Sequence, residues 1–239
     1  MSKIKIVYKT LLKFYGHTDA WKEVKEVLDA DAKSLNIGED EFYDPFKNLI
    51  IGILSQNTSD RNCTRAYIGL VRKTEITPQA LSNLSVEEIR EAIKTGGLYN
   101  LKAKRIRNLA KTILEKYEGK ADLIIVQNSP EETRKRLLEL PGIGPKTADV
   151  FIAYCMNYGV IPVDTNIARV AKRLGLVREE AGYEEIKDTL EKEIEPKERI
   201  RAHELLIRLG RDFCTAKNPS CKNCPLAHTC DSSYHHLSF

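Results

Sequence analysis

Helix start signals recur along this 239-residue chain, and no sustained strand-like alternation of apolar and polar residues accompanies them. Short polar residues stand before a proline or three residues before a glutamate, at Asp44-Pro45, Thr77-Pro78, Ser85 to Glu88 and Ser129-Pro130. There the polar side chain can accept from a backbone N–H of the first turn, and proline suits the first helical position. The apolar stretches 123–126 and 160–163 are too brief to build a sheet. The sequence therefore predicts an all-α fold.

The composition is that of a folded chain with a solvated surface. Apolar residues make up 42% of the sequence and charged residues 30%, which excludes a disordered or low-complexity protein. The longest aliphatic stretch, residues 49–54, is far shorter than a membrane span, and the N-terminus shows no secretory signal. We expect no membrane partner and an intracellular location. Abundant Lys and Glu are also typical of thermophilic sources.

A basic stretch between residues 101 and 120 has two interpretations. It carries seven Lys and Arg against two Glu, hence a net charge of +5: Lys102, Lys104, Arg105, Arg107, Lys111, Lys116 and Lys120 against Glu115 and Glu118. Apolar residues at helical spacing occur in the same stretch, and most of the basic residues lie off their face. The stretch is either an ordinary solvated helix face, the simpler interpretation, or a surface that faces phosphates.

Two glycines mark a sharp turn between helical patterns that run from Pro130 to about Leu138 and from Pro145 to about Asn157. The turn reads Leu-Pro-Gly-Ile-Gly-Pro-Lys-Thr over residues 140–147. Glycines let the backbone approach another molecule closely, and the helix N-terminus that follows favours an anion such as a DNA phosphate. Gly-x-Gly alone would suit an ordinary tight turn. The whole string resembles the helix-hairpin-helix element of DNA-binding repair proteins.

Lys146 and Asp164 are candidate reactive residues. Lys146 falls in the first turn of the second hairpin helix, where the positive helix end disfavours the ammonium form. A neutral amine is a nucleophile that can form a Schiff base with a sugar carbon. Asp164 follows eighteen residues later, directly before a helical pattern over 165–174, so it is also a typical N-cap. Taken separately, Lys146 is by default a surface or phosphate-binding lysine and Asp164 a helix cap.

Four of the six cysteines gather near the C-terminus at spacings typical of a ligand set: Cys214, Cys221, Cys224 and Cys230. Four thiolates suit a tetrahedral zinc ion or an iron–sulfur cluster, and the spacing leaves both open. Disulfides suit an intracellular chain less well. Cys63 and Cys155 have no such partners in the sequence and are expected to be small core residues or incidental thiols.

Taken in chain order, these motifs resemble the endonuclease III family of DNA glycosylases, within the larger helix-hairpin-helix glycosylase superfamily. The string at residues 140–148 followed by Val-Asp-Thr at 163–165 carries the resemblance. Segments 44–46, 53–60 and 97–103 agree with further family motifs, so the resemblance covers roughly residues 40–231.

The resemblance implies an all-α, two-domain helix-hairpin-helix DNA glycosylase fold. A six-helix barrel domain would span residues 40–158, with the helix-hairpin-helix at 130–157. An iron–sulfur cluster domain would be discontinuous and would join residues 1–39 to residues 159–239.

The resemblance also implies residue roles. Lys146 matches the nucleophile that attacks the sugar C1′, and a lysine there implies strand scission by β-elimination. Asp164 matches the carboxylate that assists this reaction. DNA-binding roles fall on hairpin residues, on two positions that probe or plug the duplex, and on two lysines between the cysteines: Gly142, Ile143, Gly144, Thr147, Asn57, Leu98, Lys217 and Lys222. The four clustered cysteines would hold a [4Fe–4S] cluster: Cys214, Cys221, Cys224 and Cys230.

The implied function is that of a bifunctional DNA glycosylase and apurinic/apyrimidinic (AP) lyase. It would remove oxidised pyrimidines from double-stranded DNA as a monomer, associated with the nucleoid in the cytoplasm of a prokaryote. Asn57 and Asn166 stand where the family commonly has glutamine and histidine, which leaves the preferred lesion open. The alternatives are a mismatch or oxidised-purine glycosylase of the same superfamily, and a non-catalytic DNA-binding module with a structural metal site.

Overall fold

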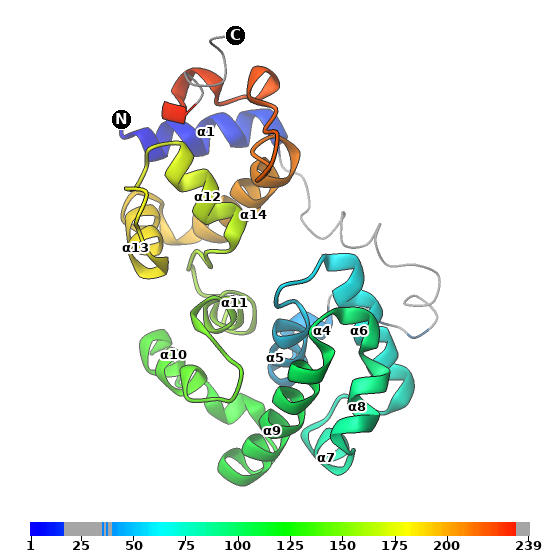
Figure 1. Cartoon of the computed structure of the whole chain (residues 1–239). Helices are drawn as coiled ribbons and strands as arrows, with labels where there is room; N and C mark the ends of the chain where they lie inside the picture. The colour runs from blue at the N-terminus through cyan, green and yellow to red at the C-terminus, as the bar shows by residue number, and fades with distance from the viewer. Residues whose placement is uncertain (17–34, 36, 38–39, 233–239) are drawn as a thin grey trace. The chain divides into compact units, whose positions relative to one another are not determined.

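The computed structural model of the chain describes residues 1–16, 35, 37 and 40–232 (Figure 1). Every regular element among these residues is a helix and none is a strand, so the all-α prediction is confirmed. No helix in the described part of the chain is long and apolar enough to span a bilayer.

The chain divides into two compact units. One joins Met1–Thr18 to Tyr158–Phe239, and the other comprises Asp19–Asn157. The second boundary differs by one residue from the one expected from the sequence. The first falls after Thr18 where the sequence suggested residue 39, and residues 17–34, 36, 38 and 39 of that stretch lie outside the described residues.

Helix α5 is the central element of the unit Asp19–Asn157. Seven of its ten residues are buried, and it packs against α4, α6, α9 and α11 (Figure 1). Such a helix is apolar on nearly all sides because it is enclosed on nearly all sides. The helices of this unit are α4 (Asp40–Tyr43), α5 (Pro45–Leu54), α6 (Asp60–Lys73), α7 (Pro78–Asn83), α8 (Val86–Ala92), η1 (Lys94–Gly96), α9 (Tyr99–Tyr117), η2 (Ala121–Ile124), α10 (Pro130–Leu138) and α11 (Pro145–Cys155).

The other unit has its own core, built around α14. Helix α14 packs against α1 and α12, and buried aliphatic side chains of all three contribute to one hydrophobic cluster. Hydrogen bonds from Ser2 to Glu193 (2.7 Å) and from Tyr15 to Asp212 (3.0 Å) attach α1 to the C-terminal helices. The helices of this unit are α1 (Lys3–Tyr15), α12 (Thr165–Arg173), α13 (Tyr183–Glu193), α14 (Pro196–Asp212), η3 (Cys221–Asn223) and η4 (Ala227–Thr229).

Three of the four predicted helix caps are confirmed. Asp44, Thr77 and Ser85 each accept a hydrogen bond from the backbone N–H three residues ahead. Ser85 and Glu88 form a complete capping box, whose hydrogen bonds from Ser85 to the carboxylate lower the pKa of Glu88 to about 2.

The predicted cap at Ser129 is wrong. Its side chain makes no cap hydrogen bond, because its ψ of 80° departs from the extended geometry that the other three caps share. The Thr133 side chain bonds to two backbone groups before the helix instead. Its hydroxyl donates to the Ser129 carbonyl (3.0 Å) and accepts from the Val126 N–H (2.9 Å).

The basic stretch 101–120 fits neither interpretation completely. It forms most of α9, but Lys102 is only 1% exposed and lies among the buried apolar residues. Arg105 and Arg107 are half-buried and donate to Gln56 and to the Leu84 carbonyl. Four of the seven basic side chains remain exposed: Lys104, Lys111, Lys116 and Lys120.

Candidate active site

The two helices that flank the glycine turn, α10 and α11, are joined by a buried ion pair. Arg134 Nε donates to Asp149 Oδ1 at 2.7 Å, and the Asp149 side chain is fully buried. Because breaking a buried ion pair is strongly destabilising, this pair helps to fix the hairpin geometry. The aliphatic residues of the turn, Leu140 and Ile143, are also buried.

Gly142 and Gly144 serve different purposes in the turn. Gly142 has a φ of 84°, and a Cβ atom there would lie 2.9 Å from Cδ of Arg105. Gly144 has an ordinary φ of −106°, is the N-cap of α11, and would place a Cβ in open space. The first glycine is therefore required by the fold, whereas the second leaves room beside the start of α11.

We expect Gly142→Ala to lower the free energy of unfolding by about 1–2 kcal/mol, because an L-residue is strained in the left-handed region. Denaturant titration measures this change. Gly144→Ala is the matched control and should change it little, since a lost N-cap preference is offset by reduced chain entropy in the unfolded state. Equal effects at the two positions would contradict this account of the turn.

Lys146 is the second residue of α11 and is half-buried. Two of its neighbours in the hairpin, Ile143 and Thr147, do not offer their side chains to a ligand. Ile143 is 6% exposed, and Thr147 packs its methyl group where a Cβ at Gly52 would otherwise lie. Any contact of Ile143 or Thr147 with DNA would therefore use the backbone, as phosphate binding at a helix N-terminus does.

Cys63 is a buried residue of α6, as the sequence predicted. Burial raises the pKa of its thiol to about 12, with Asp60 adding to the effect and Lys102 and Lys146 opposing it. The thiol is thus protonated at neutral pH and behaves as a small core side chain.

Asp164 is the N-cap of α12, and both of its carboxylate oxygens are engaged. Oδ1 accepts from the Ile167 backbone N–H at 2.8 Å, and Oδ2 accepts from the Asn166 side-chain amide at 2.9 Å. The Asn166 oxygen accepts in turn from Arg169 (2.8 Å), whose Nε donates to the Cys214 carbonyl (2.7 Å). A continuous chain of hydrogen bonds therefore joins Asp164 to the first cysteine of the C-terminal set.

Asn57 lies in the loop between α5 and α6, and Leu98 is the N-cap of α9; both are exposed and have left-handed backbones. Their φ angles are 50° and 47°, and the Leu98 side chain is 52% exposed. A left-handed conformation is costly for a leucine and is commonly found at functional sites. Both residues thus have the exposure that a probe of a DNA duplex needs.

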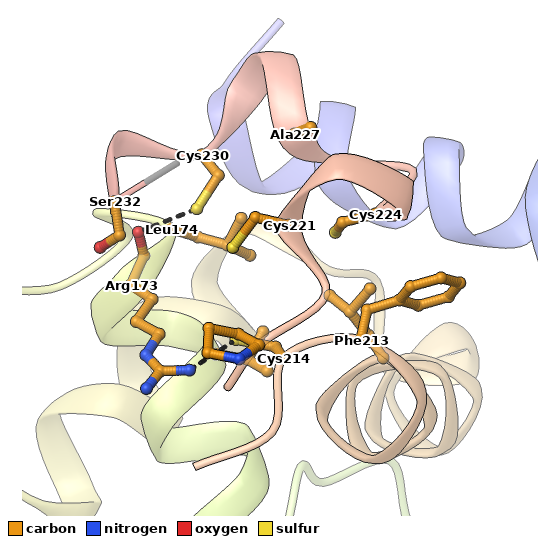
Figure 2. Close-up of a pocket in the computed structure, with 12 residues that line it drawn as sticks. Arg173, Leu174, Phe213, Cys214, Cys221, Cys224, Ala227, Cys230 and Ser232 are labelled. Atoms are coloured by element: carbon orange, nitrogen blue, oxygen red, sulfur yellow. Dashed lines mark hydrogen bonds between the residues drawn. The ribbon is translucent and has the colours of Figure 1, made fainter. Parts of the chain in front are cut away.

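The four clustered cysteines line one pocket (Figure 2). None of the four is in a disulfide bond, and the remaining walls are largely apolar, from Val170, Leu174, Leu209 and Phe213. Within the described residues, no three His, Cys, Asp or Glu side chains form a group that could hold a metal ion. The set therefore lines a pocket and does not close on a single point.

Lys217 and Lys222 are exposed on the loops between these cysteines. Lys222 lines a second, polar hollow together with Arg173, Asn218 and Asn223. Arg173 also donates to the Thr215 carbonyl at 2.7 Å, which holds the loop against α12.

Comparisons with known proteins identify the family. The model of the "HhH-GPD superfamily base excision DNA repair protein" matches residues 50–196. Endonuclease III of Bacillus subtilis is 35% identical over 190 residues, which cover 78% of this chain and 80% of that protein. This chain belongs to the endonuclease III family.

Members of the endonuclease III family are DNA glycosylases of base excision repair, and so is this protein. A candidate DNA repair glycosylase of Methanocaldococcus jannaschii is 30% identical over 94% of each chain. A solved structure of a trapped covalent intermediate between endonuclease III and DNA has a TM-score of 0.74 and 31% identity, covering 92% of this chain and 99% of that one. Relatives come from prokaryotes, thermophiles among them.

The unit Asp19–Asn157 of this endonuclease III family member contains Lys146, the hairpin glycines, Asn57 and Leu98; the other unit contains Asp164, the four cysteines, Lys217 and Lys222.

Sequence reasoning missed three polar side chains: Gln56, Lys102 and Arg169. Gln56 is adjacent to Asn57, and Arg169 lies one helical turn after Asn166, so proximity was the available signal. The contact of Lys102 with the Leu54 carbonyl gave none, because Leu54 is 48 residues away.

Proposed function

We propose that this endonuclease III family member is a bifunctional DNA glycosylase and AP lyase that removes oxidised pyrimidines from duplex DNA. The observation that carries the proposal is Lys146 in the first turn of α11, directly after the Gly-x-Gly turn. In support, a structurally similar endonuclease III of 31% identity has been trapped as a covalent intermediate with DNA. A lysine amine is the side chain suited to such an intermediate, since it forms a Schiff base with a sugar carbon.

In the proposed reaction, the neutral Nζ of Lys146 attacks C1′ of the damaged nucleotide. The glycosidic bond breaks, and the base leaves with its electron pair and takes up a proton. The sugar ring opens to a protonated Schiff base, which acidifies the proton on C2′. Loss of that proton expels the 3′ phosphate by β-elimination, and water then hydrolyses the Schiff base and returns the amine.

Asp164 assists by stabilising positive charge as it develops on the sugar and by accepting protons. Preorganised charge is effective in this role because it does not have to reorient during the reaction. The hydrogen bonds from Ile167 and Asn166 hold the carboxylate in one orientation. Capping α12 and serving the reaction are therefore compatible roles for this side chain.

Asn57 and Leu98 are proposed to occupy the duplex where the damaged base has left it. A base must rotate out of the stack before C1′ can be attacked, at a cost of a few kcal/mol. Apolar or amide side chains inserted into the stack offset part of that cost. The exposure of Leu98 and its strained backbone support this role.

The four clustered cysteines are proposed to hold a [4Fe–4S] cluster, which members of this family typically carry. A tetrahedral zinc ion would require the four sulfurs to converge to about 3.8 Å from one another, given bonds of about 2.3 Å. Cysteines that line a pocket with apolar walls fit a cluster better, because each binds a different iron atom. When bound, the cluster would fix the loop that presents Lys217 and Lys222, and iron and sulfide analysis measures its presence.

We further propose that the enzyme acts as a monomer on damaged DNA in the prokaryotic cytoplasm. A single chain supplies every residue assigned above, so no second copy is required. The distribution of relatives among prokaryotes supports the location, because their DNA lies in that compartment.

A panel of duplexes tests the substrate assignment. Base release is measured on duplexes with one oxidised pyrimidine, one 8-oxoguanine or one mismatch. We expect the oxidised pyrimidine to be released fastest, with the strand cut at the same site. Fastest release of 8-oxoguanine or of a mismatched base would replace this assignment with one of those substrates. Binding without release of any base would support a non-catalytic module.

A further inference from the structure

Lys102 is a buried cation with two specific partners. Its Nζ donates to the Leu54 carbonyl and to the Gly96 carbonyl, each at 2.7 Å, and the side chain is 1% exposed. Leu54 is the last residue of α5 and Gly96 is the last residue of η1. Helix C-termini carry partial negative charge and unpaired carbonyls, which compensates a cation placed there. Desolvation by burial nevertheless lowers the pKa of Lys102, because burial disfavours the charged amine. Keeping this contact therefore costs the fold some stability.

The two carbonyls lie two or three residues before Asn57 and Leu98, which are exposed and have left-handed backbones. Asn57 is three residues after Leu54, and Leu98 is two residues after Gly96. The backbone N–H of Lys102 also donates to the Leu98 carbonyl at 3.0 Å. Lys102 therefore bonds to the backbone next to or within two exposed segments, residues 55–59 and 97–99. We call these segments the wedge loops.

Arg105 and Gln56 extend this connection to the hairpin. Arg105 lies one turn after Lys102 on α9, and its Nη1 donates to Gln56 Oε1 at 2.6 Å. Gln56 Nε2 donates to the Gly142 carbonyl at 2.9 Å. A guanidinium has only donors, so it must face the amide oxygen, and the amide NH2 is thereby directed to the hairpin. The Arg105 stem also lies close to Gly142.

We propose that Lys102, Arg105 and Gln56 act as a clamp that sets the spacing between the two wedge loops and the hairpin that carries Lys146. These are positioning residues: they hold the groups that meet DNA. The roles of the wedge loops and of Lys146 rest on the proposed function, whereas the contacts of the clamp do not. The clamp matters only where the duplex must be opened, which gives it a signature distinct from that of a stabilising core residue.

Lys102→Met tests the clamp, because methionine keeps most of the stem and removes the amino group. Borohydride-trapped adduct is measured on an abasic site in duplex DNA and on the same site in a single strand, where no base stack has to be opened. We expect the duplex rate to fall about 10- to 100-fold, the scale of small misplacements at a reacting centre, with the single-strand rate nearly unchanged. Lys94→Met is the matched control, because Lys94 is an exposed lysine two residues before Gly96. It should keep the wild-type ratio of the two rates.

Equal losses on duplex and single strand would show that Lys102 only stabilises the fold and would overturn the proposal. No loss on either substrate would overturn it as well. If Lys102→Met does not fold, Arg105→Met replaces it, since it keeps the stem beside Gly142 and loses only the bond to Gln56. The same selective loss on duplex DNA is expected, and its absence would overturn the proposal.

Hydrogen exchange in the free protein separates a failure of the clamp from a failure of the proposed function. Lys102→Met should speed amide exchange in the wedge loops and leave α11 unchanged. If wild type formed no adduct on any DNA, the proposed function would fail while this readout still tested the clamp. Unchanged exchange in the wedge loops would overturn the clamp itself.

Discussion

Lys146→Met is expected to abolish strand cleavage and covalent trapping while the protein still binds duplex DNA. Methionine has nearly the length of lysine but no amine, so the proposed Schiff base cannot form. Removing a covalent nucleophile costs about 10⁴-fold or more in rate, because the remaining groups cannot replace it. Rates of cleavage of an abasic duplex, together with affinity for an uncleavable duplex, measure both parts of this expectation.

The control for Lys146→Met is Lys111→Met, which removes an exposed lysine from α9. It should match the wild type in trapping. A non-catalytic DNA-binding module makes a different prediction: Lys146→Met would weaken binding slightly and change nothing else. Cleavage that persists at the wild-type rate in the variant would refute the assignment of Lys146 as nucleophile.

Asp164→Asn is expected to slow base release by about 10²- to 10³-fold, because a neutral amide cannot stabilise positive charge on the sugar. The free energy of unfolding should fall by only about 1 kcal/mol. An asparagine still offers its oxygen to the Ile167 N–H, but its NH2 group then faces the NH2 of Asn166. Single-turnover kinetics and denaturant titration measure the two effects separately.

Asp44→Asn is the matched control for Asp164→Asn. Asp44 caps α5 in the same way, accepting from the Lys47 N–H at 2.8 Å, and is assigned no part in the reaction. It should lose little stability, because asparagine and aspartate are about equally good N-caps, and it should keep wild-type base release. If Asp164→Asn also released the base at the wild-type rate, Asp164 would be a helix cap only.

Features whose partners are close in sequence could be predicted. The caps at Asp44, Thr77 and Ser85 depend on an N–H three residues away, so the local pattern determines them. The hairpin and the cysteine set are also short-range patterns, in which residue type and spacing carry the chemistry. Ser129 shows the limit of this reasoning, because its ψ angle, which no residue pattern states, removed the expected bond.

Long-range contacts could not be predicted from the pattern. Lys102 carries a charge, and its apolar neighbours at helical spacing suggested only that α9 has a buried face. Its partner Leu54 is 48 residues away, and Gln56 reaches a carbonyl 86 residues away. A buried lysine is stable only where carbonyls converge on it, and the folded chain alone determines where that happens.

The most direct test of the proposed reaction is borohydride reduction of the wild-type protein on a duplex with an oxidised pyrimidine, followed by peptide mapping with mass spectrometry. We expect one adduct, with the sugar remnant attached to Lys146. No adduct from protein that binds the duplex, or an adduct on a different residue, would contradict it.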